Sequence, residues 1–403
     1  MARPTALLLF FLVALALLGG IHFYLWARLV RDTALPLLPR RALAVLFTLA
    51  ALGVPVGMLL IRRFPFRVTR ALMAVLFTWM GAAFLLFVAL VATDLARMLW
   101  AGARPLLALL GAQLAPAPDP ERRAFVARAM AGGALLAAGS ATAASVRIAT
   151  GEPRVVEVPV RLERLPRELS GFTLAQITDL HVGPTIREKH VKRVVDLTNA
   201  LRPDAVVITG DLVDGSVAEL RAATEHLARL SAKHGVYFVT GNHEYYSGAN
   251  AWLAELRRYG IRTLSAERVA VGDRGPGGAS FDLAGLDDWS VARAEDGRWP
   301  SLELALRGRD RDRSLVLLQH QPRGLDEAAQ AGVELQLSGH THGGQLFPWS
   351  LAVKAFFPYY RGLYLHRLGN ASTQLYVSCG AGYWGPPMRL GAPSEVTKLV
   401  LTT

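Results

Sequence analysis

The sequence predicts an α/β domain preceded by a membrane-embedded helical region. Long apolar segments dominate residues 1–150 and give the 403-residue chain a mean hydropathy of +0.29, which is high for a wholly soluble protein. After residue 150, short β-branched runs alternate with amphipathic stretches, as in α/β domains. Asp, Asn and His residues directly follow several of these runs, at the sheet edge where such domains bind ligands.

The formal net charge of +12 is concentrated in the apolar half of the chain. Residues 1–150 contain fifteen Arg and four acidic residues, whereas residues 151–403 are nearly neutral. Arg that flanks long apolar segments is typical of membrane proteins, so nucleic acid is not an expected partner. The single cysteine, Cys379, excludes an intrachain disulfide and a thiolate metal site.

Three segments are long and apolar enough to cross a bilayer, namely 5–27, 42–61 and 71–93. Residues 98–114 are shorter and contain Arg104 and Pro105, so they form either a fourth span or an interfacial helix. We therefore assign three or four transmembrane helices to residues 1–115. Within them, His22 and Asp94 lie close to segment ends, which favours anchoring in the membrane bilayer over transport.

Residues 116–150 combine a basic flank with a weakly apolar segment at 129–146. Arg122-Arg123, with Arg128, resembles a twin-arginine export signal, which would make the twin-arginine export machinery a partner. The alternative is a last span with a positive cytoplasmic flank. Either interpretation places residue 151 onward outside the cytoplasm. We thus expect a multi-pass cell-membrane protein with an extracytoplasmic C-terminal domain.

The Arg-rich loops do not determine the side of the N-terminus. Loops 28–41 and 62–70 are separated by one span and would lie on opposite sides of the membrane, yet both are rich in the Arg that favours the cytoplasmic side. Three spans before residue 122 would place the N-terminus outside, and four would place it inside. The sequence also leaves open whether segment 129–146 is cleaved.

The domain at residues 151–403 contains seven predicted strands: 172–178, 204–209, 235–240, 281–285, 314–319, 333–338 and 374–379. Helices are predicted at 187–201, 216–232 and about 250–259, where apolar residues recur at helical spacing. Residues 270–280 are Gly-rich and predict a surface loop.

The chemistry is carried by short blocks after these strands. They are Asp179-x-His181, Gly210-Asp211-x-x-Asp214, Gly241-Asn242-His243-Glu244, His320 and Gly339-His340-x-His342. A lone Asp at such a position is usually a turn or capping residue, and a lone His is usually a core residue. Five blocks of oxygen and imidazole ligands at one sheet edge instead predict a site for two divalent metal ions. Asp211 has two carboxylate oxygens and can bridge them.

These blocks resemble the complete motif set of calcineurin-like metallophosphoesterases, and the Gly339–Gln345 stretch after apolar spans is similar to their membrane-anchored branch. The resemblance implies a four-layer α/β/β/α sandwich over residues 151–403. It implies one metal on Asp179, His181, Asp211 and His342, and a second on Asp211, Asn242, His320 and His340. Mn, Fe and Zn all suit these ligands.

The resemblance further implies hydrolysis of phosphodiester or pyrophosphate bonds by a metal-bridged hydroxide, with His243 as general acid. Arg389 lies in a tail that resembles the family's closing motif and could bind a substrate phosphate or form a structural salt bridge. The aromatic segment 346–364 either packs over the sheet or forms a membrane-facing rim.

Together with the anchor, such a rim favours lipid-linked substrates. The alternatives are a phosphodiesterase or phosphatase acting on soluble phosphoesters such as cyclic nucleotides and, outside the enzymes, a lipid-handling or transport membrane protein.

Overall fold

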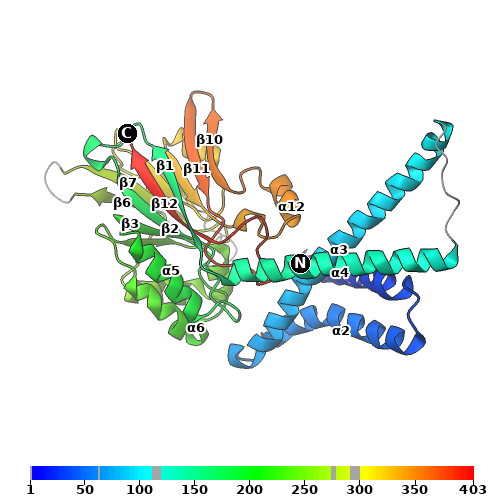
Figure 1. Cartoon of the computed structure of the whole chain (residues 1–403). Helices are drawn as coiled ribbons and strands as arrows, with labels where there is room; N and C mark the ends of the chain where they lie inside the picture. The colour runs from blue at the N-terminus through cyan, green and yellow to red at the C-terminus, as the bar shows by residue number, and fades with distance from the viewer. Residues whose placement is uncertain (1, 62–63, 111–118, 274–277, 291–299) are drawn as a thin grey trace. The chain divides into compact units, whose positions relative to one another are not determined.

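The computed structural model describes residues 2–61, 64–110, 119–273, 278–290 and 300–403 (Figure 1). The chain divides into two compact units, Met1–Val146 and Arg147–Thr403. The first unit is helical, and the second contains all the described β-strands.

Four long helices account for most of the first unit. They are α1 (Ala2–Trp26), α2 (Leu37–Ile61), α3 (Phe66–Leu109) and α4 (Pro120–Thr150), whose last turn belongs to the second unit. A π-helical turn, η1 (Ala27–Arg31), continues α1. All four helices include segments long and apolar enough to cross a membrane. Each satisfies its backbone hydrogen bonds internally, as a bilayer requires.

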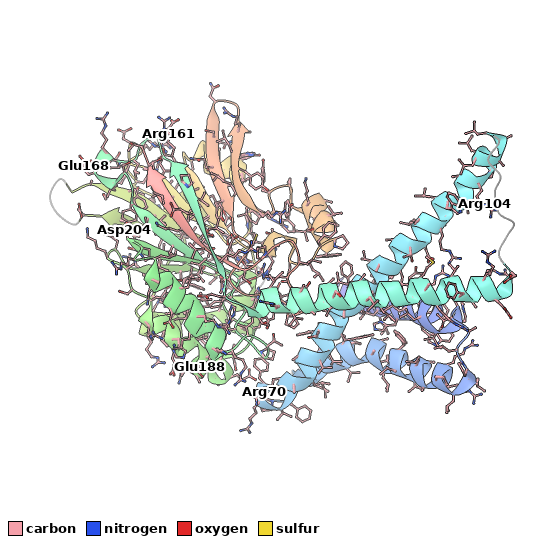
Figure 2. The ribbon with its side chains drawn as sticks, in the orientation of Figure 1. Arg70, Arg104, Arg161, Glu168, Glu188 and Asp204 are labelled. Carbon is pink, nitrogen blue, oxygen red and sulfur yellow. The ribbon has the colours of Figure 1, made fainter. Side chains whose placement is uncertain are left out.

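The structure does not contain the expected break between residues 93 and 98. Helix α3 runs without interruption for 44 residues and includes Arg104 and Pro105 (Figure 2). Proline removes one helical hydrogen bond and costs about 3 kcal/mol in a helix interior. The Leu, Ala and Arg residues on both sides of it favour a helix, and helix formation is cooperative, so the helix continues. At about 1.5 Å per residue α3 exceeds the thickness of a bilayer core. Residues 111–114 of the predicted segment lie outside the described residues.

The two ionisable residues predicted within the spans are both partnered. The Asp94 carboxylate accepts hydrogen bonds from Tyr24 Oη at 2.6 Å and Arg28 Nε at 2.8 Å. His22 Nε2 accepts a hydrogen bond from Trp79 Nε1 at 2.9 Å. These pairs join α1 and η1 to α3, so the polar groups hold helices together.

The second unit contains two six-stranded mixed sheets. The first has the order β1-β12-β2-β3-β4-β5 and the second β10-β11-β9-β8-β7-β6. The first sheet comprises β1 (Arg154–Arg161), β2 (Thr173–Ile177), β3 (Ala205–Thr209), β4 (Val236–Val239), β5 (Arg262–Thr263) and β12 (Glu395–Thr402). The second comprises β6 (Glu267–Gly272), β7 (Ser280–Gly285), β8 (Leu315–Leu318), β9 (Leu335–Ser338), β10 (Gly362–Leu368) and β11 (Ala371–Val377).

Helices cover the outer faces of both sheets, which completes the predicted four layers (Figure 1). Beside the first sheet lie α5 (Glu188–Ala200), α6 (Val217–Thr224) and α8 (Ala249–Arg258). On the second sheet, α10 (Leu302–Ala305) and α11 (Leu325–Gln330) share an apolar cluster with β8. The α/β/β/α architecture implied by the resemblance is confirmed.

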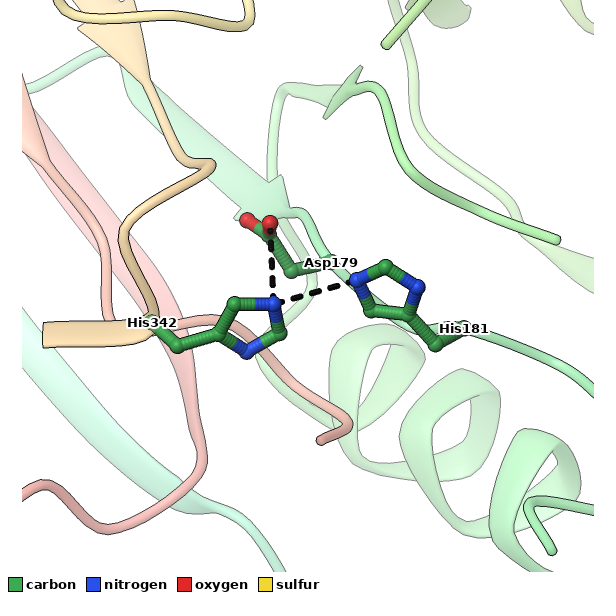
Figure 3. Close-up of side chains that lie close together, drawn as sticks. All are labelled: Asp179, His181 and His342. Atoms are coloured by element: carbon green, nitrogen blue, oxygen red, sulfur yellow. Dashed lines mark hydrogen bonds and ion pairs between the residues drawn. The ribbon is translucent and has the colours of Figure 1, made fainter. Parts of the chain in front are cut away.

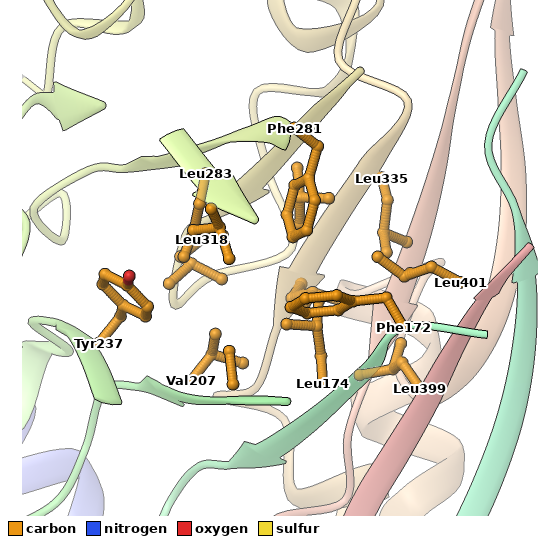
Figure 4. Close-up of a cluster of buried hydrophobic side chains, with 14 of the residues drawn as sticks. Phe172, Leu174, Val207, Tyr237, Phe281, Leu283, Leu318, Leu335, Leu399 and Leu401 are labelled. Carbon is orange, nitrogen blue, oxygen red and sulfur yellow. The ribbon is translucent and has the colours of Figure 1, made fainter. Parts of the chain in front are cut away.

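The main core lies between the two sheets (Figure 4). Phe172 and Phe281 meet edge to face there, with ring centroids 5.2 Å apart. Strand β8 serves two layers, because Val316 and Leu318 join this core while Leu315 and Leu317 face the outer helices. A strand buried on both faces appears in the sequence as a continuous apolar run, which is why β8 could be predicted.

All seven predicted strands are present, but β1, β5, β6, β10 and β12 were not predicted. β1 is an edge strand interrupted by charged residues and Pro159, a pattern that argues against a strand. The loop expected at 270–280 overlaps the ends of β6 and β7, and its residues 274–277 lie outside the described residues. The helix expected at 216–232 ends at Thr224 and continues as a 3₁₀ turn, η3 (Glu225–Arg229).

Candidate metal centre

The predicted ligands come from five loops at the carboxyl ends of parallel strands. Asp179 and His181 follow β2, Asp211 follows β3, Asn242 and His243 follow β4, His320 follows β8, and His340 and His342 follow β9. Both sheets therefore deliver side chains to one shared edge. This is the arrangement expected for a binding site in parallel sheets.

Five of these residues adopt a left-handed backbone conformation. Their φ angles lie between 49° and 72°, at Asp179, His181, Asp211, His340 and His342. Side chains other than glycine rarely adopt this region, and each such residue stores about 1–3 kcal/mol of strain. The surrounding fold holds the loops in these conformations, which turn the side chains toward one another.

The first group consists of Asp179, His181 and His342 (Figure 3). His342 Nε2 lies 3.1 Å from His181 Nε2 and 3.5 Å from Asp179 Oδ1. All three residues are buried. Two imidazole nitrogens and a carboxylate oxygen that face one point are typical ligands of a transition metal or zinc.

The second group consists of Asp211, His320 and His340. His320 Nε2 lies 3.1 Å from Asp211 Oδ2 and 3.2 Å from His340 Nδ1. Asp211 Oδ2 is also 3.8 Å from His181 Nε2 of the first group. Asp211 thus lies between the two groups, where a bridging carboxylate would be needed.

Asn242 contributes a buried acceptor without a partner. Its Oδ1 atom has no hydrogen bond within the described part of the chain, although the residue is buried. Buried carbonyl oxygens nearly always have a partner, because leaving one unsatisfied costs about 1–3 kcal/mol. A bound cation is a partner that would satisfy this oxygen, so Asn242 fits the ligand role that the resemblance implies.

Residues behind the ligands fix the orientation of the imidazole rings. Asp214 Oδ1 accepts hydrogen bonds from His181 Nδ1 at 3.0 Å and from His243 Nδ1 at 2.6 Å. The Thr209 carbonyl accepts one from His320 Nδ1 at 2.8 Å. Each bond leaves the Nε2 lone pair facing the site, which is how outer residues prepare a histidine for metal binding.

The buried carboxylates make the site attract positive charge. Burial alone would lower the pKa of His181, but the carboxylates of Asp214, Asp211 and Asp179 together outweigh it and raise that pKa to about 9. Burial also opposes protonation of His320, yet Asp211 raises the His320 pKa well above its usual value. In contrast, burial lowers the pKa of His340 to about 3. A bound cation would replace the protons on His181 and His320.

Glycines allow the loops to approach each other closely. A Cβ atom at Gly241 would lie 2.2 Å from Asp211 Oδ1, and one at Gly339 would lie 2.1 Å from Asp179 Oδ2. The buried Glu244 carboxylate also joins two loops, because it accepts backbone N–H bonds from Asp211 at 3.0 Å and Gly241 at 2.6 Å. Glu244 therefore positions a ligand loop and does not reach the ligand side of the site.

Arg389 lies behind His342 and is fully buried. Its guanidinium donates to the carbonyls of Gly382 and Cys379 at 2.7 Å and of Ala392 at 2.8 Å, and Nη2 is 3.2 Å from His342 Nδ1. These contacts correct both predicted roles. The side chain is not offered to a substrate phosphate, and its partners are main-chain carbonyls rather than a carboxylate. The structure supports a positioning role for Arg389.

Two aromatic residues at the rim were not predicted. The rings of Tyr246 and Trp384 lie 5.2 Å and 5.8 Å from the His243 ring, and the two residues are 69% and 54% exposed. Tyr246 follows His243 by three positions on α7 (Asn242–Ser247), a spacing that could have identified it. Trp384 comes from a distant loop, and no local pattern indicates its position.

Comparisons with known proteins match the domain that carries this site. Residues 172–344 match the family described as calcineurin-like phosphoesterase. The zebrafish (Danio rerio) "transmembrane protein with metallophosphoesterase domain" is 39% identical over 253 residues, which cover 62% of this chain and 57% of that protein. An uncharacterized metallophosphoesterase of Helicobacter pylori strain J99 is 38% identical, with coverages of 62% and 64%.

A third relative is shorter and is matched over most of its length. An uncharacterized metallophosphoesterase of Aquifex aeolicus strain VF5 is 35% identical over 244 residues, which cover 60% of this chain and 89% of that protein. The chain thus matches less than two thirds of the length of the first two relatives and nearly all of the third.

Proposed function

This chain belongs to the calcineurin-like metallophosphoesterase family, and we propose that it is a membrane-anchored phosphoester hydrolase with two divalent metal ions. The observation that carries the proposal is the position of Asp211 between two groups of buried ligands. The first ion would be held by Asp179, His181, Asp211 and His342. The second would be held by Asp211, Asn242, His320 and His340.

When bound, two such ions polarise phosphoryl oxygens and make hydroxide available near neutral pH. The chain itself supplies a proton donor at the rim. His243 is partly exposed, and the hydrogen bond from its Nδ1 to Asp214 leaves Nε2 on the site side, 4.0 Å from Asp211 Oδ2. His243 can therefore protonate the leaving oxygen as a general acid.

We propose phosphodiester or pyrophosphate bonds of lipid-linked molecules as the substrate class. The support is that the same chain carries four helices apolar enough to span a membrane and exposes aromatic side chains beside the site. The four apolar helices support a multi-pass protein of the cell membrane, and because the Arg122–Arg128 flank favours the cytoplasm, we propose that the catalytic domain is extracytoplasmic. Soluble phosphoesters such as cyclic nucleotides are the competing substrates that the experiment below must separate.

The first experiment measures hydrolysis of a chromogenic phosphodiester and of the matching monoester by the purified full-length chain. The protein is stripped of metal and then supplied with Mn²⁺, Fe²⁺ or Zn²⁺. We expect turnover only with metal, and loss of that turnover in Asp211→Asn. Asp196→Asn is the matched control, because Asp196 is a half-exposed residue of α5 that pairs with Lys192 and Arg229. Failure of the parent protein to bind any metal would overturn the proposal.

A further inference from the structure

Helix α12 (Trp349–Phe356) exposes an apolar surface directly after the ligand loop of His342. None of its residues is buried, and Trp349, Leu351 and Phe356 are 54%, 61% and 79% exposed. Trp349 and Phe356 are two helical turns apart and share one face. Phe347, just before the helix, is also exposed. Several large apolar side chains exposed on one short helix are typical of an interaction surface.

The segment is held against the metal centre at both ends. At its start, Gln345 Nε2 donates to the Trp384 carbonyl at 2.9 Å, and the Trp384 N–H donates to Gln345 Oε1 at 3.0 Å. At its end, Thr341 Oγ1 donates to the Tyr360 carbonyl at 2.6 Å, and the Phe357 ring lies 5.5 Å from the His340 ring. The exposed helix is therefore a fixed part of the rim of the site.

The chain segment that contains α12 has charged side chains of one sign. Residues 335–394 contain no Asp or Glu, a span of the chain that includes α12, β10 and β11. Three exposed basic residues lie within it, namely Lys354, Arg361 and Arg367. Apolar and aromatic side chains combined with basic residues are the composition of surfaces that bind anionic membranes.

The last turn of helix α4 belongs to the domain that carries the rim. Helix α4 is apolar enough to span a bilayer and ends at Thr150. Ala149, in its last turn, packs against Ile186 and Tyr383, and Tyr383 is adjacent to the rim residue Trp384. The rim is therefore on the same chain as four helices that could cross a bilayer, which makes a membrane surface its expected partner.

We propose that α12, Phe347 and Trp384 form a membrane-contacting surface that lies in the headgroup layer of an anionic phospholipid bilayer and admits lipid phosphoesters to the metal centre. Trp and Phe favour this layer, and the basic residues attract its phosphates. This inference rests on the proposed function and narrows its substrate to phosphoesters presented by the bilayer.

The first test locates the surface in full-length protein reconstituted into phosphatidylcholine–phosphatidylglycerol vesicles. A fluorescent probe is attached at Phe356→Cys or, as a control, at Leu304→Cys on α10, where Leu304 is also exposed. The native Cys379 does not compete for the probe, because burial raises its pKa to about 12. A lipid-attached quencher should quench the probe at position 356 and not at 304. Equal quenching of both probes by an aqueous quencher would overturn the proposal.

The second test separates delivery of lipid from catalysis. It compares hydrolysis of vesicle lipids, both a phosphodiester and a pyrophosphate, with hydrolysis of the soluble chromogenic phosphodiester. In Trp349→Ser/Phe356→Ser we expect lipid turnover to fall about a hundredfold, since burial of each large apolar side chain contributes about tenfold in affinity. Turnover of the soluble ester should be unchanged in this variant. The control Val155→Ser/Leu304→Ser should change neither rate.

The outcomes distinguish this inference from the proposed function. The membrane-contacting surface is overturned if the parent protein does not hydrolyse lipid, or if the α12 variant hydrolyses lipid as fast as the parent. Turnover of the soluble ester would still support the hydrolase in either case. If the metal-bound parent protein hydrolyses neither the lipids nor the soluble ester, the proposed hydrolase function is overturned.

Discussion

Single carboxylates determine what each histidine of the centre can do. Asp214 contacts the Nδ1 atoms of both His181 and His243, yet these two histidines have different surroundings. His181 is buried among the ligands, whereas His243 remains partly exposed between Tyr246 and Trp384. The same carboxylate thus orients two imidazoles, one buried at the candidate metal centre and one at its partly exposed rim.

We predict that His243→Asn retains both metals and loses about 10²–10⁴-fold in turnover of an ester with a poor leaving group. An ester that releases nitrophenolate should lose much less, because that leaving group needs no proton. Metal content by mass spectrometry and kcat for the two esters are the measurements. His226→Asn on the surface is the control. Loss of metal would instead make His243 a ligand, as its proximity to His181 and Asp211 permits.

Metal affinity is predicted to rise with pH. Below about pH 9 the metal-free His181 is protonated, and His320 also has a raised pKa, so a cation must displace these protons. Each displaced proton makes the apparent affinity about tenfold tighter per pH unit, until pH passes the pKa. Calorimetry in buffers of different ionisation enthalpy measures the protons released. Asp214→Asn removes the main cause of the raised His181 pKa and should flatten the slope, whereas an affinity independent of pH would contradict the prediction.

Replacing Arg389 with Lys should lower stability without raising KM. Lysine keeps the positive charge but cannot donate to the carbonyls of Cys379, Gly382 and Ala392 together, and each buried carbonyl left unpaired costs about 1–3 kcal/mol. Each kcal/mol lowers Tm by roughly 2–4 °C in a domain of this size. The exposed Arg367→Lys serves as control. A normal Tm with a raised KM would restore the phosphate-binding role.

At the scale of elements, the site depends on how closely loops from different strands approach. The loops after β2 and β9 belong to different sheets, and Gly339 lets the β9 loop pass against Asp179. The N–H of His340 donates to both Asp179 oxygens, at 2.9 Å and 3.0 Å. The two sheets are therefore joined at the site by a ligand carboxylate as well as by the core.

Gly339→Ala should reduce occupancy of the first metal position and lower turnover at least tenfold. The new Cβ would overlap Asp179 Oδ2, so the ligand must move from a geometry that tolerates displacements below about 1 Å. Gly139→Ala on α4 is the matched control, because a Cβ there meets nothing within 4 Å. Metal content and thermal unfolding should be measured together. Full metal occupancy with wild-type turnover would contradict this account of the loop contact.

For the whole molecule, the position of the catalytic domain relative to the membrane is the main prediction. A C-terminal alkaline phosphatase reporter, which is active only outside the cytoplasm, should be active, because the Arg122–Arg128 flank favours the inside. Arg122→Lys/Arg123→Lys separates the two explanations of that flank. Reporter activity falls if the flank is a twin-arginine signal and persists if it only orients a span. Arg40→Lys/Arg41→Lys is the matched control, and an active cytoplasmic reporter would contradict the topology.

Local sequence is sufficient to identify the buried central strands, the candidate ligands and the apolar helices. The sequence shows continuous apolar runs at the central strands β2, β3, β4, β8 and β9. Because neighbouring parallel strands end at the same edge of a sheet, the residues that directly follow these runs can be assigned to that edge from sequence alone. Residue types at those positions are enough to indicate metal chemistry. Edge strands such as β1 escape prediction because their burial pattern is weak and their stability comes from a partner, β12, far along the chain.

Tertiary contacts determine which side chains from segments far apart in the sequence lie next to each other. They place Arg389 under His342 instead of beside the substrate, Trp384 next to His243, and α12 at the rim with its apolar residues exposed. None of these positions follows from spacing, since each results from two loops that meet only after both sheets have packed. The amino-acid order specifies which chemical groups are present, and the packing of the sheets determines which of them meet and which remain open to a ligand.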